Sequence, residues 1–170
     1  MKRAFTALLI AISFAAGPVL AAENWVLSFG RLGPVQVGMT AEAVSKIFSA
    51  EVIRELTPED PDCNYISPKV GGDSVAFMVT QGRISRIDVS APGIYTADGI
   101  QVGDTEERVK SIHGEELVIE PHHYLAPEGN YLTIMNDKGS LAIRFETYQG
   151  IVTTFHTGKF PEIEYAEGCL

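Results

Sequence analysis

One motif occurs twice in this chain, 65 residues apart, and it restricts the fold more than any other feature. Val37-Gly38-Met39-Thr40 is matched at that distance by Val102-Gly103-Asp104-Thr105. Further matches keep the same order while the offset grows slowly from 65 to 68; they include Val44 with Val109, Asn64-Tyr65 with Asn130-Tyr131, and Gln81-Gly82 with Gln149-Gly150. An ordered series of this kind indicates an internal duplication, so we expect both halves to form the same structural unit.

Each copy of the motif is typical of the start of a helix. Thr40 and Thr105 stand at the N-cap position, where a hydroxyl can accept a hydrogen bond from a first-turn amide. Glu42 and Glu107 follow in the first turn, where the helix dipole favours negative charge. Apolar residues then recur at helical spacing, and a glycine can cap the second helix; the residues are Val44, Ile47 and Phe48 in the first copy, and Val109, Ile112 and Gly114 in the second.

Extended segments bounded by turn residues follow each expected helix. They cover 51–56, 63–66, 75–80 and 84–89 in the first copy, and 117–120, 131–135, 141–146 and 152–157 in the second. Two hairpin turns are expected, at 80–83 and 137–140. We therefore predict an α+β fold, in which two tandem helix-plus-antiparallel-meander units form one curved sheet with the helices on one face.

Residues 1–21 have the features of a secretory signal peptide. Lys2 and Arg3 precede an apolar stretch, 4–16, and small residues lie around Ala21. The stretch is shorter than the roughly 20 residues that span a bilayer, so we expect cleavage and no membrane anchor. The remaining chain divides into a first repeat unit, 22–97, and a second, 98–170, within one compact domain. The expected location is the periplasm or the outside of the cell.

Charge and cysteine content narrow the partners and the compartment. The sequence has 13 basic and 22 acidic residues, a net charge of −9, and nucleic acids or anionic membranes would require basic patches. A basic or neutral protein partner suits this charge better, and the alternative is that the acidity only keeps an exported protein soluble. Cys63 and Cys169 are the two cysteines of the sequence, and an even number in an exported chain favours a disulfide between them. Two free thiols or a metal-binding pair are the alternatives.

The Val-Gly-Met-Thr-x-x-x-Val pattern at 37–44, a later strand with Tyr65 and a hairpin ending in Gly-x-Ile at 82–84 carry a resemblance. This pattern resembles the repeat of β-lactamase inhibitory proteins, and similar single units occur in BamE-type outer-membrane assembly lipoproteins. The resemblance implies a curved sheet whose concave face and edge loops clamp a partner protein. The inhibitors have a disulfide within each half, whereas this chain has cysteines for one bridge, and it lacks a lipid-attachment cysteine.

Motifs of catalysis are missing from the sequence. It contains no Gly-x-Ser-x-Gly, Ser-x-x-Lys or His-Glu-x-x-His motif and no phosphate-binding glycine loop. We therefore expect no catalytic residues, no cofactor and no metal. His122-His123 is the most metal-like feature, with His113 and His156 as possible helpers, but adjacent residues of an extended segment point to opposite faces. The acidic loop 57–62, which contains Asp60, is interpreted as a solvated turn. The alternatives are a calcium-binding loop, although the regular ligand spacing is missing, and a contact to a basic cleft of a partner.

Alternation predicts which side chains lie on the open face of the sheet. If Val75, Phe77 and Val79 face the helices, polar residues of four strands share the opposite face. Aromatic and arginine anchors among polar residues are typical of protein-binding surfaces, although a charged solvent-facing sheet is the alternative. Together with the loops at 57–62 and 121–130, the predicted binding residues are Tyr65, Met78, Arg86, Asp88, Tyr131, Arg144, Glu146, His156, Asp60, His122, His123 and Tyr124.

These features predict an exported, non-enzymatic protein-binding module. It would inhibit or modulate an envelope or secreted enzyme, such as a β-lactamase or another hydrolase. The first alternative is a periplasmic small-ligand or carbohydrate-binding protein, in which aromatic rings stack on sugars; these rings are Trp25, Tyr65, Tyr124 and Tyr131. A hydrolytic enzyme is the second alternative.

Overall fold

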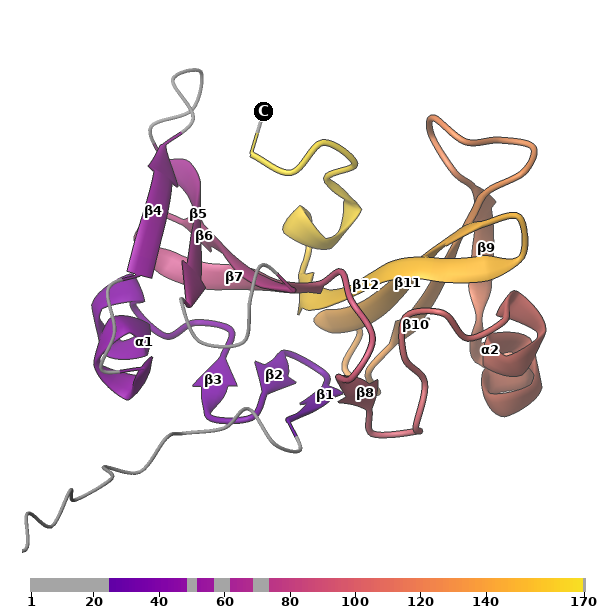
Figure 1. Ribbon diagram of the computed structural model, residues 1–170, viewed down its shortest axis with the longest axis horizontal. Coiled ribbons are helices and arrows are strands. Elements are labelled where there is room, and N and C mark those ends of the chain that lie inside the picture. The colour runs from indigo at the N-terminus through magenta and orange to yellow at the C-terminus, as the bar shows by residue number, and fades with distance from the viewer. Residues whose placement is uncertain (1–24, 49–51, 57–61, 69–73, 170) are drawn as a thin grey trace, which may run out of the picture.

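The computed structural model describes residues 25–48, 52–56, 62–68 and 74–169. The expected signal peptide and Asp60 lie outside these residues. Within them the chain forms twelve strands, two α-helices and two short 3-10 helices (Figure 1). In chain order they are β1 (Val26–Ser28), β2 (Arg31–Leu32), β3 (Val35–Gln36), α1 (Ala41–Phe48), β4 (Val52–Leu56), β5 (Cys63–Pro68), β6 (Val75–Thr80), β7 (Arg83–Val89), β8 (Tyr95–Thr96), α2 (Glu106–His113), η1 (Gly114–Glu116), β9 (Val118–Pro121), β10 (Asn130–Met135), β11 (Leu141–Tyr148), β12 (Ile151–Lys159) and η2 (Glu162–Glu164).

The larger sheet has eight strands in the order β4-β5-β6-β7-β12-β11-β10-β9, and each neighbouring pair is antiparallel. All eight strands predicted from the sequence are therefore present. The sheet is curved: in Figure 1 β4 and β9 stand upright at its two ends, with β7, β12 and β11 crossing between them. The meanders meet where β7 pairs with β12, which places Asp88 opposite His156.

A second sheet, with the order β3-β2-β1-β8, was not predicted. Its strands have two or three residues each, too few to show the alternation that identifies a strand in a sequence. In Figure 1 this sheet lies between α1 and α2, on the convex side of the larger sheet. Leu27, Leu32 and Val35 join it to the main hydrophobic core, which also contains Phe77, Ile87, Phe145 and Phe155 of the larger sheet.

The predicted α+β class, with two helix-plus-meander units and helices on one face of a single curved sheet, is therefore wrong. The described residues are mostly β and form two sheets, and each α-helix has eight residues. The two helix patterns in the sequence were real, but two turns of helix cover little of an eight-stranded sheet. The four-stranded sheet adds its own buried side chains to the same core.

The repeated motif has the same geometry in both places. Gly38 and Gly103 have φ angles of 91° and 95°, a left-handed region that favours glycine. Their amides donate to the carbonyl oxygens of Ile84 at 2.7 Å and Val152 at 2.9 Å, so each helix start is fixed to the hairpin that follows it. The predicted N-caps are confirmed because each threonine hydroxyl accepts a hydrogen bond of 3.2 Å from an amide three residues later; the residues are Thr40 and Thr105.

The apolar stripe of the second helix is only partly confirmed. Val109 is buried, but Ile112 is exposed, and the buried residue beside Val109 is Glu106. The Glu106 carboxylate binds Lys110 at 2.6 Å and accepts a hydrogen bond of 2.7 Å from the Thr147 hydroxyl. Burial opposes the charge of this carboxyl, but these partners hold its pKa below the ordinary value. The residue types alone gave no sign that this glutamate is buried, with a half-exposed lysine as its partner.

Candidate functional site

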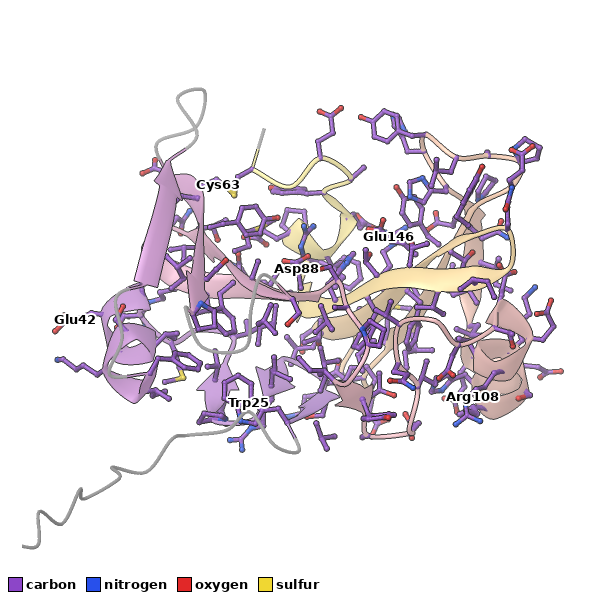
Figure 2. All side chains as sticks on the ribbon, in the orientation of Figure 1. Trp25, Glu42, Cys63, Asp88, Arg108 and Glu146 are labelled. Carbon is purple, nitrogen blue, oxygen red and sulfur yellow. A yellow bond between two sulfur atoms is a disulfide. The ribbon has the colours of Figure 1, made fainter. Side chains whose placement is uncertain are left out.

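The chain turns back over the concave face of the larger sheet after β12. We call residues 160–169 the C-terminal segment; it contains η2 and ends in a disulfide between Cys169 and Cys63, whose Cα atoms lie 5.3 Å apart. The predicted disulfide is therefore confirmed. Figure 1 shows the segment between the two raised ends of the sheet, and Figure 2 shows Asp88 and Glu146 on this same side, away from Trp25.

Beneath and beside the segment, polar side chains of six strands form one connected set, which we call the polar network. The register of the sheet assembles it, since Met78 lies opposite Arg86, His156 opposite Arg144, and Tyr131 between Glu120 and Glu146. Its members are Tyr65, Arg86, Asp88, Glu120, Tyr131, Arg144, Glu146 and His156 on the strands, and His122 just after β9.

Arg86 connects the network to the C-terminal segment. Its Nη1 donates to the carbonyl oxygens of Glu162 at 3.1 Å and Tyr165 at 2.8 Å. Its Nη2 donates to the Tyr65 hydroxyl at 2.7 Å, and its Nε lies 2.9 Å from the Asp88 carboxylate. Burial opposes the charge of Arg86, but the negative Asp88 beside it raises the guanidinium pKa above its ordinary value. Burial raises the Asp88 pKa, and Arg86 counteracts only part of that rise.

His156 is fully enclosed at the centre of the network. Its Nε2 lies 3.0 Å from the carbonyl oxygen of Ile163, so the ring carries its proton there and donates to the C-terminal segment. Its Nδ1 lies 3.8 Å from an oxygen of Asp88 and 3.8 Å from an oxygen of Glu146. Burial, together with the positive charge of Arg86, holds the pKa of this imidazole well below its ordinary value. The ring is therefore neutral at pH 7.

The other end of the network surrounds Tyr131. The His122 ring stacks on Tyr131 with ring centres 4.4 Å apart, and its Nε2 lies 3.3 Å from the Glu146 carboxylate. The Arg144 guanidinium lies 4.3 Å from the centre of the Tyr131 ring, a cation–π contact, and donates to Glu120 at 2.7 Å. Burial is the main cause that raises the pKa of the Tyr131 hydroxyl.

The structure brings together most of the predicted binding residues but does not leave them open. The predicted sharing of one sheet face is confirmed by the strand register for Met78, Arg86, Asp88, Arg144 and His156, while Val75, Phe77 and Val79 lie in the main core. The sequence left the face of Tyr65 and Tyr131 open. The expectation that these residues form an open surface is corrected by their burial, since the C-terminal segment and His122 cover them. The buried members are Met78, Arg86, His122, Tyr131, Arg144 and His156.

An open cleft of about 530 Å³ remains beside the C-terminal segment. It lies between that segment and the loop after β9, and its lining consists of Cys63, His123, Tyr124, Tyr165, Ala166, Glu167, Gly168 and Cys169. Tyr124 is 55% exposed and Tyr165 is 41% exposed. The Tyr124 hydroxyl donates a hydrogen bond to the Glu167 carboxylate across the cleft, and this bond raises the tyrosine pKa. The cleft therefore presents two aromatic side chains to a ligand.

The aromatic residues expected to stack on sugars are mostly covered. Tyr65 lies under Gly168, where a Cβ would come within 2.6 Å of the tyrosine hydroxyl oxygen. Tyr131 lies between His122 and Arg144, and Trp25 packs against Phe48 in the core with ring centres 5.4 Å apart. Of the four rings, Tyr124 alone is among the exposed large side chains. This arrangement does not favour a sugar platform.

The histidine pair does not converge on one point. His122 is buried against Tyr131, whereas His123 is exposed and makes an edge contact with Tyr124, with ring centres 4.5 Å apart. Among residues 25–48, 62–68 and 74–169, no group of three or more histidine, cysteine or acidic side chains is arranged to hold a metal ion. No helix in the described part of the chain has both the length and the apolar character needed to cross a bilayer.

The C-terminal contacts were missed by the sequence analysis. Thr80 donates to the Glu162 carboxylate at 2.7 Å, and Lys159 lies 3.1 Å from the same carboxylate. Burial opposes the charge of Glu162, but these partners hold its pKa below the ordinary value. Ile163 is completely buried between Glu162 and Glu164. The predicted disulfide was the sequence feature that could have indicated these contacts, because a bond to Cys63 brings the end of the chain to β5.

No family model and no curated protein matches the sequence. Among solved structures, the chain is similar to an extracellular protein containing a SCP domain from Bacillus anthracis str. Ames. The two share 9% sequence identity with a TM-score of 0.48, over 88% of this chain and 50% of that chain. The chain thus spans half the length of that protein. These comparisons assign neither a family nor an activity.

Proposed function

We propose that this chain is an exported, non-catalytic protein-binding module that inhibits or modulates an envelope or secreted enzyme. The contact surface is the rim of the cleft on the concave side, formed by the loop after β9 and the C-terminal segment. A β-lactamase is one candidate partner, because the repeat motif resembles that of β-lactamase inhibitory proteins, which implies docking on the concave side. Other secreted hydrolases are equally compatible with the surface.

The observation that carries this proposal is the pair of exposed tyrosines beside the cleft. Tyr124 and Tyr165 are held on opposite sides of it, one by a loop and the other by a disulfide-anchored segment. Large aromatic side chains on a rigid frame are the residues that most often dominate protein–protein affinity. The cleft volume, about 530 Å³, can accept one or two side chains of a partner.

The charge around the cleft supports a partner with basic residues. Exposed carboxylates occur in the same parts of the chain as the two tyrosines, namely on β9, in the loop after it and in the C-terminal segment; they belong to Glu120, Glu128, Glu164 and Glu167. Opposite charges steer association and increase its rate at low salt, while the aromatic contacts slow dissociation. The acidic net charge of the chain, −9, acts in the same direction. We therefore expect a partner whose association rate decreases as salt increases.

Export is part of the proposal. Disulfides persist in oxidising compartments, and the Cys63–Cys169 bridge is formed in the folded chain. The basic and apolar sequence at 1–21 is the second support. Together they favour the periplasm or the extracellular space as the place where the partner is met.

Affinity capture with matched variants tests the proposal. The oxidised mature protein is immobilised and exposed to envelope and secreted extracts, beside a Tyr124→Ala/Tyr165→Ala double variant. Tyr95→Ala is the control, because Tyr95 is 45% exposed but lies on β8 of the smaller sheet. The captured partner is identified by mass spectrometry, and its affinity and activity are then measured with each variant.

The double variant should bind the partner at least about 30-fold more weakly, since truncating a hot-spot residue costs roughly 2 kcal/mol or more. Tyr95→Ala should stay within about twofold of the parent protein, because a surface residue outside the interface contributes little. The proposal is rejected if no protein is enriched, if the double variant binds as well as the parent, or if saturating binding leaves the partner's activity unchanged.

A further inference from the structure

We propose that the Cys63–Cys169 disulfide is a redox latch: when a dithiol reductant opens it, the C-terminal segment leaves the concave face and exposes the polar network. This inference extends the proposed function to the regulation of the same face, and its biological meaning rests on that function. The structural claim is independent of that function, since it concerns only whether the disulfide is closed and whether the segment lies on the sheet.

The C-terminal segment is attached to the sheet as a cover and not as a strand. Within the described part of the chain, the backbone amides of this segment donate internally, from Glu164 to Pro161, from Tyr165 to Glu162 and from Gly168 to Tyr165. The bonds that hold it to the sheet come from side chains of the polar network and from Thr80. Segments without a ladder of backbone hydrogen bonds are the ones that open locally at the lowest free energy.

The disulfide lies at the free end of this cover. β12 anchors the segment at its start, and the bridge to Cys63 fixes its end, 106 residues away in sequence. Between the two anchors, Gly168 passes so close to Tyr65 that a Cβ would lie 2.6 Å from the hydroxyl oxygen. When the bridge opens, the end that includes Tyr165 and Gly168 keeps only side-chain contacts, so the ordering of about ten residues is no longer supported at both ends.

The cleft borders the bridge without exposing it to solvent. Both Cys63 and Cys169 belong to the cleft lining, together with the exposed Tyr124 and Tyr165. Each cysteine is only 3% exposed and packs with the buried Met78, so the C-terminal segment must first open locally before a thiolate can reach a sulfur atom. The rim that we propose as a protein contact can hold a dithiol protein beside the segment, so that reduction captures the locally opened state and prevents the end from being tied back.

The chemistry is ordinary thiol–disulfide exchange. A thiolate of the reductant attacks one sulfur of the bridge and forms a mixed disulfide, while the other cysteine leaves as a thiolate and takes up a proton. The second thiol of the reductant then resolves the mixed disulfide. In total two electrons and two protons pass to the chain, which gains two thiols, and the reductant becomes a disulfide.

Opening would change what the concave face offers to a partner. Arg86 loses the two carbonyl acceptors of the segment, and His156 loses the carbonyl of Ile163. Thr80 loses the Glu162 carboxylate. The exposed face then has donors that were arranged for peptide carbonyls and a carboxylate, so the two redox states present different surfaces to a protein partner.

Hydrogen exchange followed by mass spectrometry tests the latch on the whole mature chain, without any partner. Exchange is compared before and after treatment with a small dithiol, and alkylation counts the thiols to show that the bridge has opened. A Cys169→Ser variant repeats the experiment without reductant, and added dithiol should change nothing further in it. We expect peptides from 160–169 to exchange at least about tenfold faster, while β11 and β12 stay protected.

Two results would overturn the inference. One is unchanged protection of 160–169 in protein that has two free thiols, which would mean that the non-covalent contacts alone hold the cover. The other is loss of protection across the whole chain, which would make the bridge a global structural element. Since no partner takes part, a failed capture experiment and a failed latch are separate outcomes.

Discussion

Tyr65 on β5 and Tyr131 on β10 occupy equivalent positions in the two halves of the larger sheet, but they are covered in different ways. Tyr65 pairs across the sheet with Glu55 and Met78, and Tyr131 pairs with Glu120 and Glu146. The cover of Tyr131 is local, because His122 follows the neighbouring strand β9. The cover of Tyr65 is Gly168, which comes from the other end of the chain.

This difference separates what the two halves share from what they do not share. The motif that starts each helix and the strands that follow it have kept the same geometry in both halves. The side chains above the concave face and the segments that cover them have changed. A local cover needs no tether, whereas a cover made by the C-terminal segment depends on its disulfide. The first half is therefore the one whose surface can be altered without unfolding the sheet.

Replacing the arginine that each half contributes to the polar network should give the largest difference in the free energy of unfolding. Arg86→Leu leaves Asp88 without its cation and removes the donor to two carbonyls of the C-terminal segment. Losing one partner of a buried ion pair costs about 3 to 5 kcal/mol. Arg144→Leu should cost about 1 kcal/mol, because its partner Glu120 is 52% exposed and can be solvated by water. Urea unfolding of the oxidised proteins measures both, and equal losses would contradict the comparison.

A pair of glycine substitutions isolates the contact between the cover and Tyr65. Gly168 and Gly139 have φ angles of 69° and 63°, so alanine is strained at either position by about 1 kcal/mol. Only at Gly168 does the added Cβ also meet a neighbour, the Tyr65 hydroxyl at 2.6 Å; at Gly139 nothing lies within 4 Å. Gly168→Ala should therefore lower the free energy of unfolding by about 2 kcal/mol, roughly twice the loss for Gly139→Ala. A Gly139→Ala loss as large as that of Gly168→Ala would show that the contact is unimportant.

The free energy of unfolding should depend on pH through the protonation of His156, since the pKa of this residue is well below the ordinary value in the folded chain. The unfolded chain takes up a proton near pH 6.5 and the folded chain does not, so this residue's contribution is complete above that pH. It declines as the pH falls toward the folded-state pKa, by at most about 1.4 kcal/mol per pH unit.

The groups that face this ring are Arg86, Asp88, Arg144, Glu146 and the Ile163 carbonyl. Asp88 has a raised pKa and contributes in the opposite sense at pH values above its unfolded value near 3.8, and it is present in both proteins of the comparison below. His156→Gln, which can still donate to Ile163, should flatten the profile between pH 7 and pH 5. Urea unfolding at several pH values measures it, and a variant with the parent's slope would exclude His156 as the cause.

Much of the local structure could be predicted because its signals lie within short stretches of sequence. The eight long strands, the N-caps at Thr40 and Thr105, the C-cap at Gly114 and the cysteine pair each follow from a few adjacent residues or from residue type. The sharing of one sheet face also followed from period-two alternation. The fold class did not, because the two- and three-residue strands of the second sheet carry no periodicity.

The site was predicted as a set of residues but not as a surface. Arg86, Arg144 and His156 lie on the expected face, yet they are buried by segments whose own sequence shows no pattern. Covering depends on contacts between residues far apart in the chain, such as Arg86 with Tyr165, which periodicity does not encode. Tyr124 was predicted correctly as an exposed loop residue, whereas Tyr165 was missed because the chain end was not expected to pass over the sheet.

Chemical labelling of tyrosines tests the central contrast between the covered and the open parts of the concave face most directly. The oxidised, mature protein is treated with a limiting amount of a tyrosine-nitrating reagent, and the extent of modification at each position is read by peptide mass spectrometry. Tyr124 and Tyr165 should be modified readily because both rings are exposed, while Tyr65 and Tyr131 should be protected by Gly168 and His122. Modification of Tyr65 as fast as that of Tyr124 would contradict the account, because the C-terminal segment would then not cover the face.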